Sequence, residues 1–258
     1  MNLWEKTPGL CEEVPQITPY VPAERKSDGA VVIFPGGGYA GRADHEGRGY
    51  AEFLNATGIT AFVVDYRVAP HHFPLPLLDA RRAVRWVRAN ALEYGIDPQK
   101  IAVMGSSAGG HLAALTATYT DSLPDEALDA IDGQDSHPNA QILCYPVICA
   151  PNGDGVAHMG SYQNLIGGGN TALEQKLDPI HNITAQTPPA FIWHTSDDDC
   201  VNVINSYRYA TALRGQNIPV ELHVLPHGPH GMGLAPGNDY IARWADWLIR
   251  WFSYIGWL

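Results

Sequence analysis

Short runs of apolar residues recur along the chain and alternate with longer stretches in which apolar residues recur every three or four positions. The first pattern is typical of strands buried on both faces, and the second of helices with one apolar side. The apolar runs predict strands at 30–34, 60–65, 101–104, 142–145, 190–193 and 220–224. The amphipathic stretches predict helices at 46–55, 77–94, 110–117, 203–214 and from about 239 onward. This alternation favours an α/β protein with a mostly parallel sheet that has helices on both faces.

Two segments interrupt the alternation. Residues 121–138 are rich in acidic side chains, and residues 151–189 contain three successive glycines at 167–169. Long segments without clear periodicity inside a compact domain are often lids or binding loops. Since no repeat or linker marks a second domain, we expect a single domain over residues 1–258 with irregular insertions around the two segments.

The C-terminal stretch is rich in aromatic residues. Helical spacing places five apolar side chains on one face of the helix that begins near Asp239: Trp244, Trp247, Leu248, Trp251 and Ile255. We expect this face to pack on the protein's own sheet. The alternative is a homo-oligomer that associates through the same helix, because aromatic residues are enriched at interfaces. The charged residues Asp246 and Arg250 argue against insertion of the helix into a membrane.

Composition excludes several classes of protein. Of the 258 residues, 45% are hydrophobic, so the chain can bury a sizeable core and is not intrinsically disordered. Its 16 Lys and Arg against 27 Asp and Glu give a net charge of −11, which disfavours a nucleic-acid partner. No apolar run approaches the roughly 18 residues of a membrane span, and the N-terminus lacks the pattern of a signal peptide. We therefore expect a cytoplasmic protein with no membrane partner.

The segment Gly105-Ser-Ser-Ala-Gly109 fits the pattern G-x-S-x-G and lies between a predicted strand and a predicted helix. A sharp strand-to-helix turn of this kind needs glycine on either side, and it lifts the serine hydroxyl clear of the sheet. The N-terminus of the following helix also favours a developing negative charge. We therefore interpret Ser107, the central serine, as a nucleophile.

A second glycine motif, Pro35-Gly-Gly-Gly-Tyr39, follows the first predicted strand. Successive glycines let backbone N–H groups approach a ligand closely. No Gly-Lys-Ser or Gly-Lys-Thr follows, so the loop does not fit a phosphate cradle. We interpret it as part of an oxyanion hole made by the N–H groups of Gly37, Gly38 and Ala108, with a merely flexible turn as the alternative.

A serine nucleophile needs a histidine base and an acid that orients this base, and in this fold the acid precedes the histidine along the chain. Three acids follow the fifth predicted strand. Asp198 is the preferred acid and Asp197 its rival, whereas Asp199 is interpreted as solvated or as a helix cap. Beyond the sixth predicted strand, His230 is the preferred base and His227 the alternative.

A metal site is a competing interpretation of the same region. His194 and His227, together with Asp197 and Asp199, are residue types that bind metal ions. No pair of histidines at helical spacing supports this interpretation. We expect neither a metal nor a cofactor.

Polar residues after the glycine motif are candidates for substrate binding. Tyr39, Arg42 and Glu46 lie close enough to the motif to reach the hydroxyl groups of a substrate. For residues 42–46 the alternative is a helix start with an acidic cap. His111, one turn into the helix that follows Ser107, is interpreted as a packed residue rather than a catalytic one.

Together these motifs resemble the α/β-hydrolase esterases, and more narrowly the bacterial acetylxylan-esterase-like branch related to the hormone-sensitive-lipase-like carboxylesterases. The resemblance runs from about Gln16 to the C-terminus. It rests on Pro35–Tyr39, Asp44–Gly47, Tyr66–Pro70, Pro76–Ala80, Gly95–Pro98, the Ser107 motif with Gly109–Leu112, and Pro229–Gly231. It implies an α/β-hydrolase fold. Because only one or two strands fit before Ala30, we expect the usual eight-stranded sheet to be trimmed at its N-terminus.

The resemblance also implies an esterase that removes acetyl groups from xylo-oligosaccharides or other small acetylated sugars inside the cell. In the matching motifs Ser107, Asp198 and His230 form the catalytic triad. Ser106 stands where the family commonly has a bulky aromatic residue, so we expect a wider pocket beside the nucleophile. The alternatives are a broad carboxylesterase or serine peptidase of the same fold, and a non-catalytic relative that binds a ligand.

Overall fold

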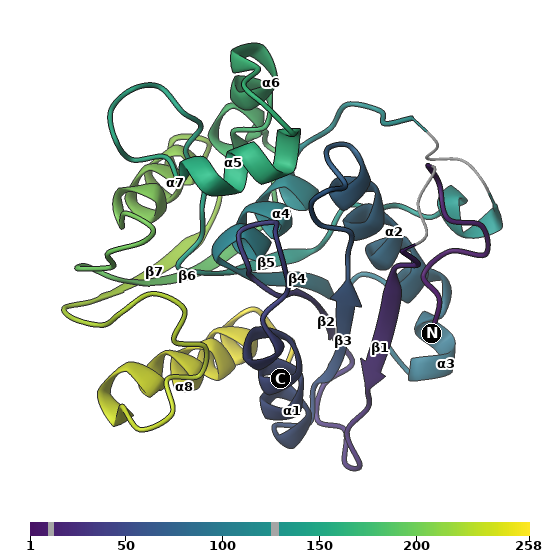
Figure 1. Ribbon diagram of the computed structural model, residues 1–258. Coiled ribbons are helices and arrows are strands. Elements are labelled where there is room, and N and C mark those ends of the chain that lie inside the picture. Colours follow the sequence, from purple (N-terminus) through teal and green to yellow (C-terminus); the bar gives the residue numbers. More distant parts are fainter. Residues whose placement is uncertain (10–12, 125–128) are drawn as a thin grey trace.

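A seven-stranded sheet forms the centre of the computed structural model, which describes residues 1–9, 13–124 and 129–258 (Figure 1). Its strands are β1 (Gln16–Tyr20), β2 (Ala30–Phe34), β3 (Thr60–Asp65), β4 (Ile101–Ser106), β5 (Ala140–Cys144), β6 (Ala190–Thr195) and β7 (Val220–Leu225). The strand order is β1-β3-β2-β4-β5-β6-β7. Of the strand pairs in the described part of the chain, only β1–β3 is antiparallel. The predicted mostly parallel sheet is confirmed, and among the described residues one strand, β1, precedes Ala30.

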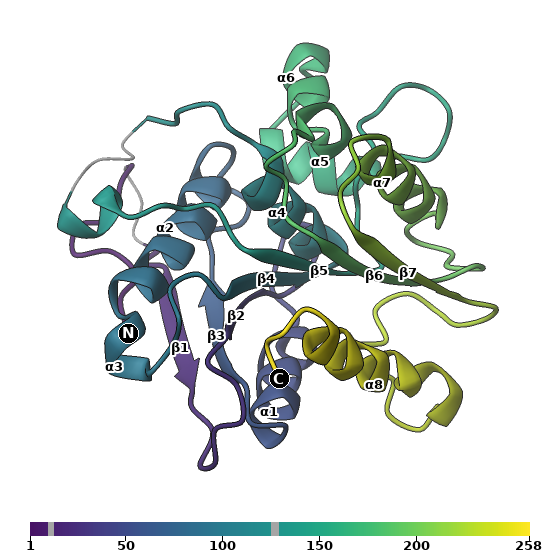
Figure 2. The ribbon, with the colours of Figure 1, turned by 180° about the vertical axis from the view of Figure 1, so that it is seen from behind.

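Helices cover both faces of this sheet. They are α1 (Asp44–Ala56), α2 (Leu75–Ala89), α3 (Ala91–Tyr94), α4 (Ser107–Thr118), α5 (Met159–Ile166), α6 (Thr171–Lys176), α7 (Ile204–Gly215) and α8 (Asp239–Tyr254), with short 3-10 helices η1 (Ala130–Gly133) and η2 (Pro179–Asn182). Helices α1 and α8 lie on one face, whereas α2, α4 and α7 lie on the other, as both views show (Figures 1 and 2).

The central strand β2 shows how the apolar runs build two cores. All five of its residues are buried. Val31 and Ile33 point to the core shared with α1 and α8, and Val32 and Phe34 point to the core shared with α2 and α4. Because side chains alternate across a strand, a continuous apolar run fits a sheet that is covered on both sides.

The predicted helix over 77–94 is interrupted at Asn90, which separates α2 from α3. The Asn90 side chain donates to the carbonyl oxygen of Trp86 at 2.7 Å. An asparagine that bonds to nearby backbone competes with regular helical hydrogen bonds, which explains the break. Gly95 then ends α3 in the left-handed conformation, with φ of +61°.

Segment 151–189 is more regular than expected, since it contains α5, α6 and η2. Each of the three helices has a side-chain cap, from His158, Asn170 and Asp178 respectively. Gly167, the first of the three glycines, ends α5 with φ of +73°. These elements are short and interrupted by glycines, so they show no clear periodicity. Two of the caps, Asn170 and Asp178, are nevertheless residue types that commonly begin helices.

Segment 121–138 is tied to α2 by its acidic residues. Asp129 and Asp132, in and beside η1, accept hydrogen bonds from the buried guanidinium group of Arg82 at 2.6 Å and 2.9 Å. Residues 125–128 of this segment lie outside the described residues. Two of the acidic residues in this segment therefore form ion pairs with the buried Arg82 of α2.

The aromatic C-terminal helix packs on the protein's own sheet, as expected. Trp244 and Leu248 of α8 are completely buried. The Trp244 ring stacks on Trp193 of β6 with centroids 4.9 Å apart, and Trp247 stacks on His223 of β7 at 4.3 Å. A homo-oligomer through this helix stays a prediction.

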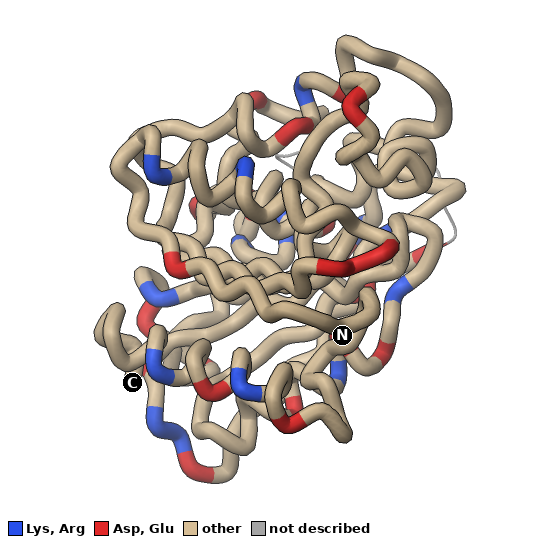
Figure 3. The backbone as a smooth tube through the Cα atoms, turned by 90° about the vertical axis from the view of Figure 1, so that its left-hand side faces the viewer, with Lys and Arg blue, Asp and Glu red and all other residues tan. Residues whose placement is uncertain are grey.

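Charged residues of both signs are interspersed along the outer segments of the chain (Figure 3). Several form exposed ion pairs, such as that between Arg48 and Glu52 on α1 at 2.7 Å. Within the described ranges, the helices are too short or too polar for any of them to traverse a lipid bilayer.

Candidate active site

The turn between β4 and α4 holds Ser107 in a strained backbone conformation. Its φ is +52°, in the left-handed region that residues with side chains rarely adopt. A Cβ atom on Gly105 would lie 2.0 Å from the carbonyl oxygen of Gly109, and one on Gly109 would lie 2.1 Å from that of Phe34. Only glycine therefore fits on either side of the serine, which is the backbone geometry predicted from G-x-S-x-G.

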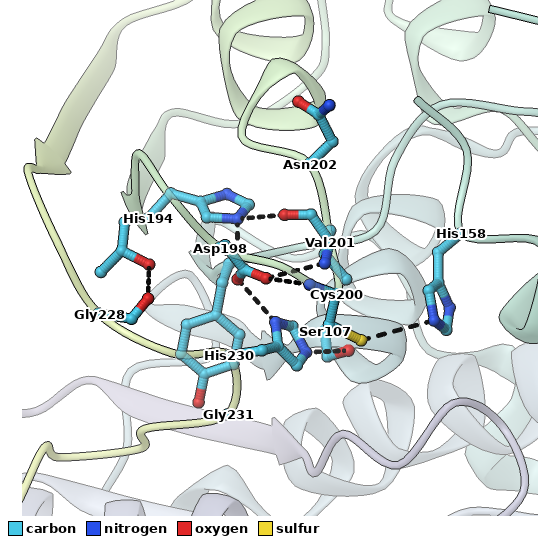
Figure 4. Close-up of polar contacts among 12 residues, drawn as sticks. Ser107, His158, His194, Asp198, Cys200, Val201, Asn202, Gly228, His230 and Gly231 are labelled. Carbon is cyan, nitrogen blue, oxygen red and sulfur yellow. Dashed lines mark hydrogen bonds and ion pairs between the residues drawn. The ribbon is translucent and has the colours of Figure 1, made fainter. Parts of the chain in front are cut away.

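Three side chains distant in sequence meet at the carboxyl edge of the sheet (Figure 4). Nε2 of His230 lies 2.9 Å from Oγ of Ser107, and Nδ1 of His230 lies 2.7 Å from Oδ2 of Asp198. In a neutral imidazole, a proton on Nδ1 satisfies both contacts, because Nδ1 then donates to the carboxylate and Nε2 accepts from the hydroxyl. The arrangement can move a proton from the serine to the histidine.

The Asp198 carboxylate is fully buried and heavily hydrogen-bonded. Its Oδ1 accepts from the backbone N–H groups of Cys200 at 2.9 Å and Val201 at 2.8 Å, and Oδ2 also lies 3.2 Å from Nε2 of His194. Burial alone would raise the pKa of Asp198, but the hydrogen bonds from His194, His230 and Val201 outweigh it and lower the pKa below its ordinary value. The group is therefore a carboxylate at neutral pH.

The rival acid and base form a separate pair on the surface. Oδ2 of Asp197 lies 3.0 Å from Nδ1 of His227, and its Oδ1 accepts from the N–H of Gly228 at 2.8 Å. Both side chains are exposed. His194 is buried against Asp198 instead, so the alternative metal-binding set is not brought together.

The glycine loop after β2 lies against the serine. A Cβ on Gly36 would approach Cβ of Ser107 to 3.2 Å. Gly37 and Gly38 have φ of +138° and +64°, and a Cβ on Gly37 would clash with the carbonyl oxygen of Gly41 at 2.3 Å. Ala108, the second residue of α4, has an N–H in the first helical turn, where no intrahelical acceptor is available.

Two of the expected substrate-binding residues are buried instead. Tyr39 is 1% exposed, and its hydroxyl lies 2.8 Å from Nδ1 of His111. His111 is itself 1% exposed, so it is a packed residue, as predicted. Glu46 is 3% exposed and accepts hydrogen bonds from the backbone of Gly36 and the hydroxyl of Tyr145. Neither Tyr39 nor Glu46 offers a free polar group to a substrate, and this expectation is corrected.

Arg42 stays a prediction as a substrate-binding residue, whereas Ser106 differs from the sequence-based picture. Arg42 is partly exposed, and its guanidinium group donates to Glu13 at 2.9 Å and to the carbonyl oxygen of Tyr66 at 2.6 Å. Ser106 is completely buried, and its Oγ lies 2.9 Å from the hydroxyl of Tyr50. The small residue at 106 therefore points away from the site and does not widen a pocket beside Ser107.

Sequence reasoning missed several neighbours of the three aligned side chains. Tyr145, directly after β5, packs edge-to-face on the imidazole of His230 with centroids 5.0 Å apart. His158, from the 151–189 segment, places Nε2 3.6 Å from Sγ of Cys200 (Figure 4). The position of Tyr145 at a strand end was the available signal, because parallel strands gather their carboxyl ends at one edge.

Comparison with known proteins identifies the family and several relatives of this chain. Residues 18–213 match the model of the BD-FAE family. The chain is 34% identical to endo-1,4-beta-xylanase B of Butyrivibrio fibrisolvens, over 95% of this chain and 39% of that protein. It is 33% identical to an acetylxylan esterase of Xylanibacter ruminicola, over 90% of this chain and 47% of that protein. The chain thus spans less than half the length of these two relatives.

A solved structure covers the chain completely. It is an acetyl ester-xyloside bifunctional hydrolase from Caldicellulosiruptor lactoaceticus, with 41% identity and a TM-score of 0.93 over 100% of this chain and 96% of that chain. Sheet order, serine turn and structural likeness define an α/β hydrolase. Within that class the chain belongs to the BD-FAE family, and its resemblance to acetylxylan esterases is confirmed.

Proposed function

We propose that this protein hydrolyses short-chain, chiefly acetyl, esters with Ser107, His230 and Asp198 as a catalytic triad. The observation that carries the proposal is the continuous line of contacts from Oγ of Ser107 through both imidazole nitrogens of His230 to the Asp198 carboxylate. A serine hydroxyl becomes an effective nucleophile when an oriented base accepts its proton.

In the first half of the reaction, Oγ of Ser107 attacks the acyl carbonyl carbon and its proton passes to Nε2 of His230. The carbonyl oxygen becomes an oxyanion, which the N–H groups of Gly37, Gly38 and Ala108 stabilise. Loss of one such donor typically costs about 10²–10³ in rate. As the ester bond breaks, the departing alcohol oxygen takes the proton from Nε2, which leaves an acyl-serine.

In the second half, a water molecule attacks the acyl-serine and gives a proton to Nε2 of His230. When the tetrahedral intermediate collapses, Oγ of Ser107 leaves and recovers that proton, and the carboxylic acid is released. Asp198, held as a carboxylate, stabilises the imidazolium that forms in each half. These steps require no metal and no cofactor.

We propose acetylated xylo-oligosaccharides, or other small acetylated sugars, as the substrates. Support comes from the names of two relatives, an acetylxylan esterase and an acetyl ester-xyloside bifunctional hydrolase. A broad carboxylesterase or a peptidase with the same triad is the alternative.

Acetate release from acetylated xylo-oligosaccharides tests the substrate, together with a series of p-nitrophenyl esters of increasing acyl length. We expect acetyl esters to be cleaved faster than butyryl or longer ones. Equal or faster cleavage of long esters would favour a broad carboxylesterase. A fluorophosphonate probe should label the wild type at Ser107 and leave Ser107→Ala unlabelled; a wild type that is neither labelled nor active would be a non-catalytic relative.

A further inference from the structure

A buried hydrogen-bond network lies beneath the proposed triad, and Glu46 of α1 is its only carboxylate among the described residues. The group is not part of the three-residue catalytic chain, yet it is 3% exposed. Burying a carboxylate is costly unless several donors satisfy it. What Glu46 contacts therefore indicates why an acid stands at this position.

One oxygen of Glu46 holds the glycine loop. Oε2 accepts the backbone N–H of Gly36 at 2.9 Å. The fit is close, because a Cβ on Gly36 would lie 2.4 Å from that oxygen and 3.2 Å from Cβ of Ser107. Gly36 is thus wedged between the carboxylate and the nucleophile, directly before the two residues proposed to bind the oxyanion.

The other oxygen of Glu46 holds the loop that carries His230. Oε1 accepts the hydroxyl of Tyr145 at 2.6 Å, and the same hydroxyl accepts the backbone N–H of Gly233 at 2.9 Å. The Tyr145 ring packs on the His230 imidazole at an interplanar angle of 69°. Burial raises the pKa of Tyr145 well above its ordinary value, and the nearby Glu46 carboxylate acts in the same direction, so the hydroxyl remains a donor.

The network also reaches the serine turn. The Tyr50 hydroxyl, from the same helix as Glu46, lies 3.2 Å from the Tyr145 hydroxyl and 2.9 Å from Oγ of Ser106. Glu46 and its neighbours therefore contact the glycine loop, the serine turn and the histidine loop, three segments that are far apart in the sequence.

We propose that Glu46 is a positioning residue, whose carboxylate fixes the glycine loop and the His230 loop relative to Ser107 through Gly36 and Tyr145. The inference rests on the proposed triad mechanism. Catalysis depends on reacting groups held in a narrow geometry, and small displacements of such groups cost large factors in rate. Since the carboxylate touches no substrate, its loss should slow the chemical steps and leave substrate binding nearly unchanged.

The test uses Glu46→Gln, Tyr145→Phe and the double variant in the full chain, with an acetyl ester as substrate. Glutamine keeps the size of the side chain but places an NH2 group, which only donates, at one of the two oxygen positions. Because Gly36 and Tyr145 donate to different oxygens of Glu46, glutamine cannot accept both hydrogen bonds in this geometry. We expect Glu46→Gln to lower kcat by about 10–100-fold and to change KM by less than about threefold. The rate of fluorophosphonate labelling at Ser107 should fall in parallel, because that reaction uses the same groups.

The double variant tests whether Glu46 and Tyr145 act through their mutual contact or lower kcat independently of each other. Residues that act through one contact give non-additive effects, so the double variant should be at most about threefold slower than the slower single variant. Tyr209→Phe is the matched control, because Tyr209 is a fully buried tyrosine whose hydroxyl donates to Gln141 at 2.9 Å, outside this network. Its kcat should stay within about twofold of wild type, even if its thermal midpoint drops.

Unchanged kcat in Glu46→Gln, multiplied losses in the double variant, or an equal loss in Tyr209→Phe would each overturn the inference. If Glu46→Gln does not fold, Tyr145→Phe alone decides, with the same kcat and KM criteria. A wild type without esterase activity and without labelling would instead refute the proposed function. The two failures are therefore distinguishable.

Discussion

His194 lies beside the acid of the proposed triad, with Nε2 3.2 Å from Oδ2 of Asp198. The imidazole is completely buried on β6, and Nε2 also lies 2.9 Å from the carbonyl oxygen of Val201. Its Nδ1 lies 2.8 Å from the hydroxyl of Ser206. With its proton on Nε2, His194 donates to the carboxylate and the carbonyl and accepts from the serine. Two histidines thus hold the carboxylate.

Replacing His194 should loosen Asp198 and slow the reaction. We expect His194→Gln to lower kcat by about tenfold with little change in KM, because the carboxylate loses one of the donors that orient it toward His230. Steady-state kinetics on an acetyl ester measure this. His223→Gln is the control, since His223 lies on β7 against Trp247. Wild-type kcat in His194→Gln would contradict the expectation.

Asp198 and Asp197 are adjacent in sequence, but we expect their replacement to have very different effects on kcat. Asp198→Asn should reduce kcat by about 10³–10⁴-fold, because an amide neither fixes the imidazole tautomer nor stabilises the imidazolium. Asp197→Asn should stay within about twofold of wild type, since its carboxylate bonds to the exposed His227 instead. Comparable losses in both variants would show that the acid was assigned to the wrong residue.

Stability should depend on pH through His111. Burial lowers the pKa of His111 to about 4 from the ordinary 6.5, although the carbonyl of Leu177 partly opposes the shift. Between these two pH values the unfolded chain binds a proton at His111 that the folded protein does not. The free energy of unfolding is therefore highest above the ordinary pKa of 6.5 and decreases as the pH falls toward the folded-state pKa of about 4. Urea unfolding at about pH 7 and about pH 5 measures this loss.

The variant His111→Gln isolates that effect. Lacking the titrating group, it should lose less of its free energy of unfolding than wild type between the same two pH values. Parallel pH dependence in the two proteins would mean that the histidine is not kept neutral by burial.

A buried ion pair elsewhere should matter for folding rather than catalysis. Arg67 and Asp79 are completely buried and contact each other at 2.7 Å, and Asp79 also accepts from the indole of Trp4 at 2.9 Å. Asp79→Ala should cost about 3–5 kcal/mol of unfolding free energy, because the guanidinium group loses its buried partner. In the exposed pair between Arg48 and Glu52, Glu52→Ala should cost less than about 1 kcal/mol. Chemical denaturation measures the unfolding free energy of both variants. Equal losses would contradict the expectation that burial makes the Arg67–Asp79 pair more important for stability.

The sequence predicted the sheet well because buried parallel strands have a strong local signature. The predicted strands at 30–34 and 60–65 coincide with β2 and β3, and the other four differ by one or two residues at their ends. The serine turn was equally visible, since its glycines follow from steric limits that any sequence must obey.

Contacts between distant segments were the part that could not be predicted. Glu46 follows a glycine motif, and its sequence position suggests that it can contact a ligand. In the structure it is buried and accepts a hydrogen bond from Tyr145, a residue 99 positions away. Ser106 faces Tyr50 rather than a pocket for the same reason. Which side chains near the ends of a helix or strand face solvent depends on packing that no local pattern contains.

The position of β7 at the edge of the sheet has a consequence for the thermal inactivation of the enzyme. His230 lies on the loop that follows this strand. Within the ranges that the structure describes, β7 pairs with β6 alone, and all its residues but Leu225 are only partly buried. Edge elements with few buried contacts open at lower free energy than the centre of a fold. On heating, activity should therefore disappear before the bulk of the secondary structure melts, because detachment of one marginal strand removes the base.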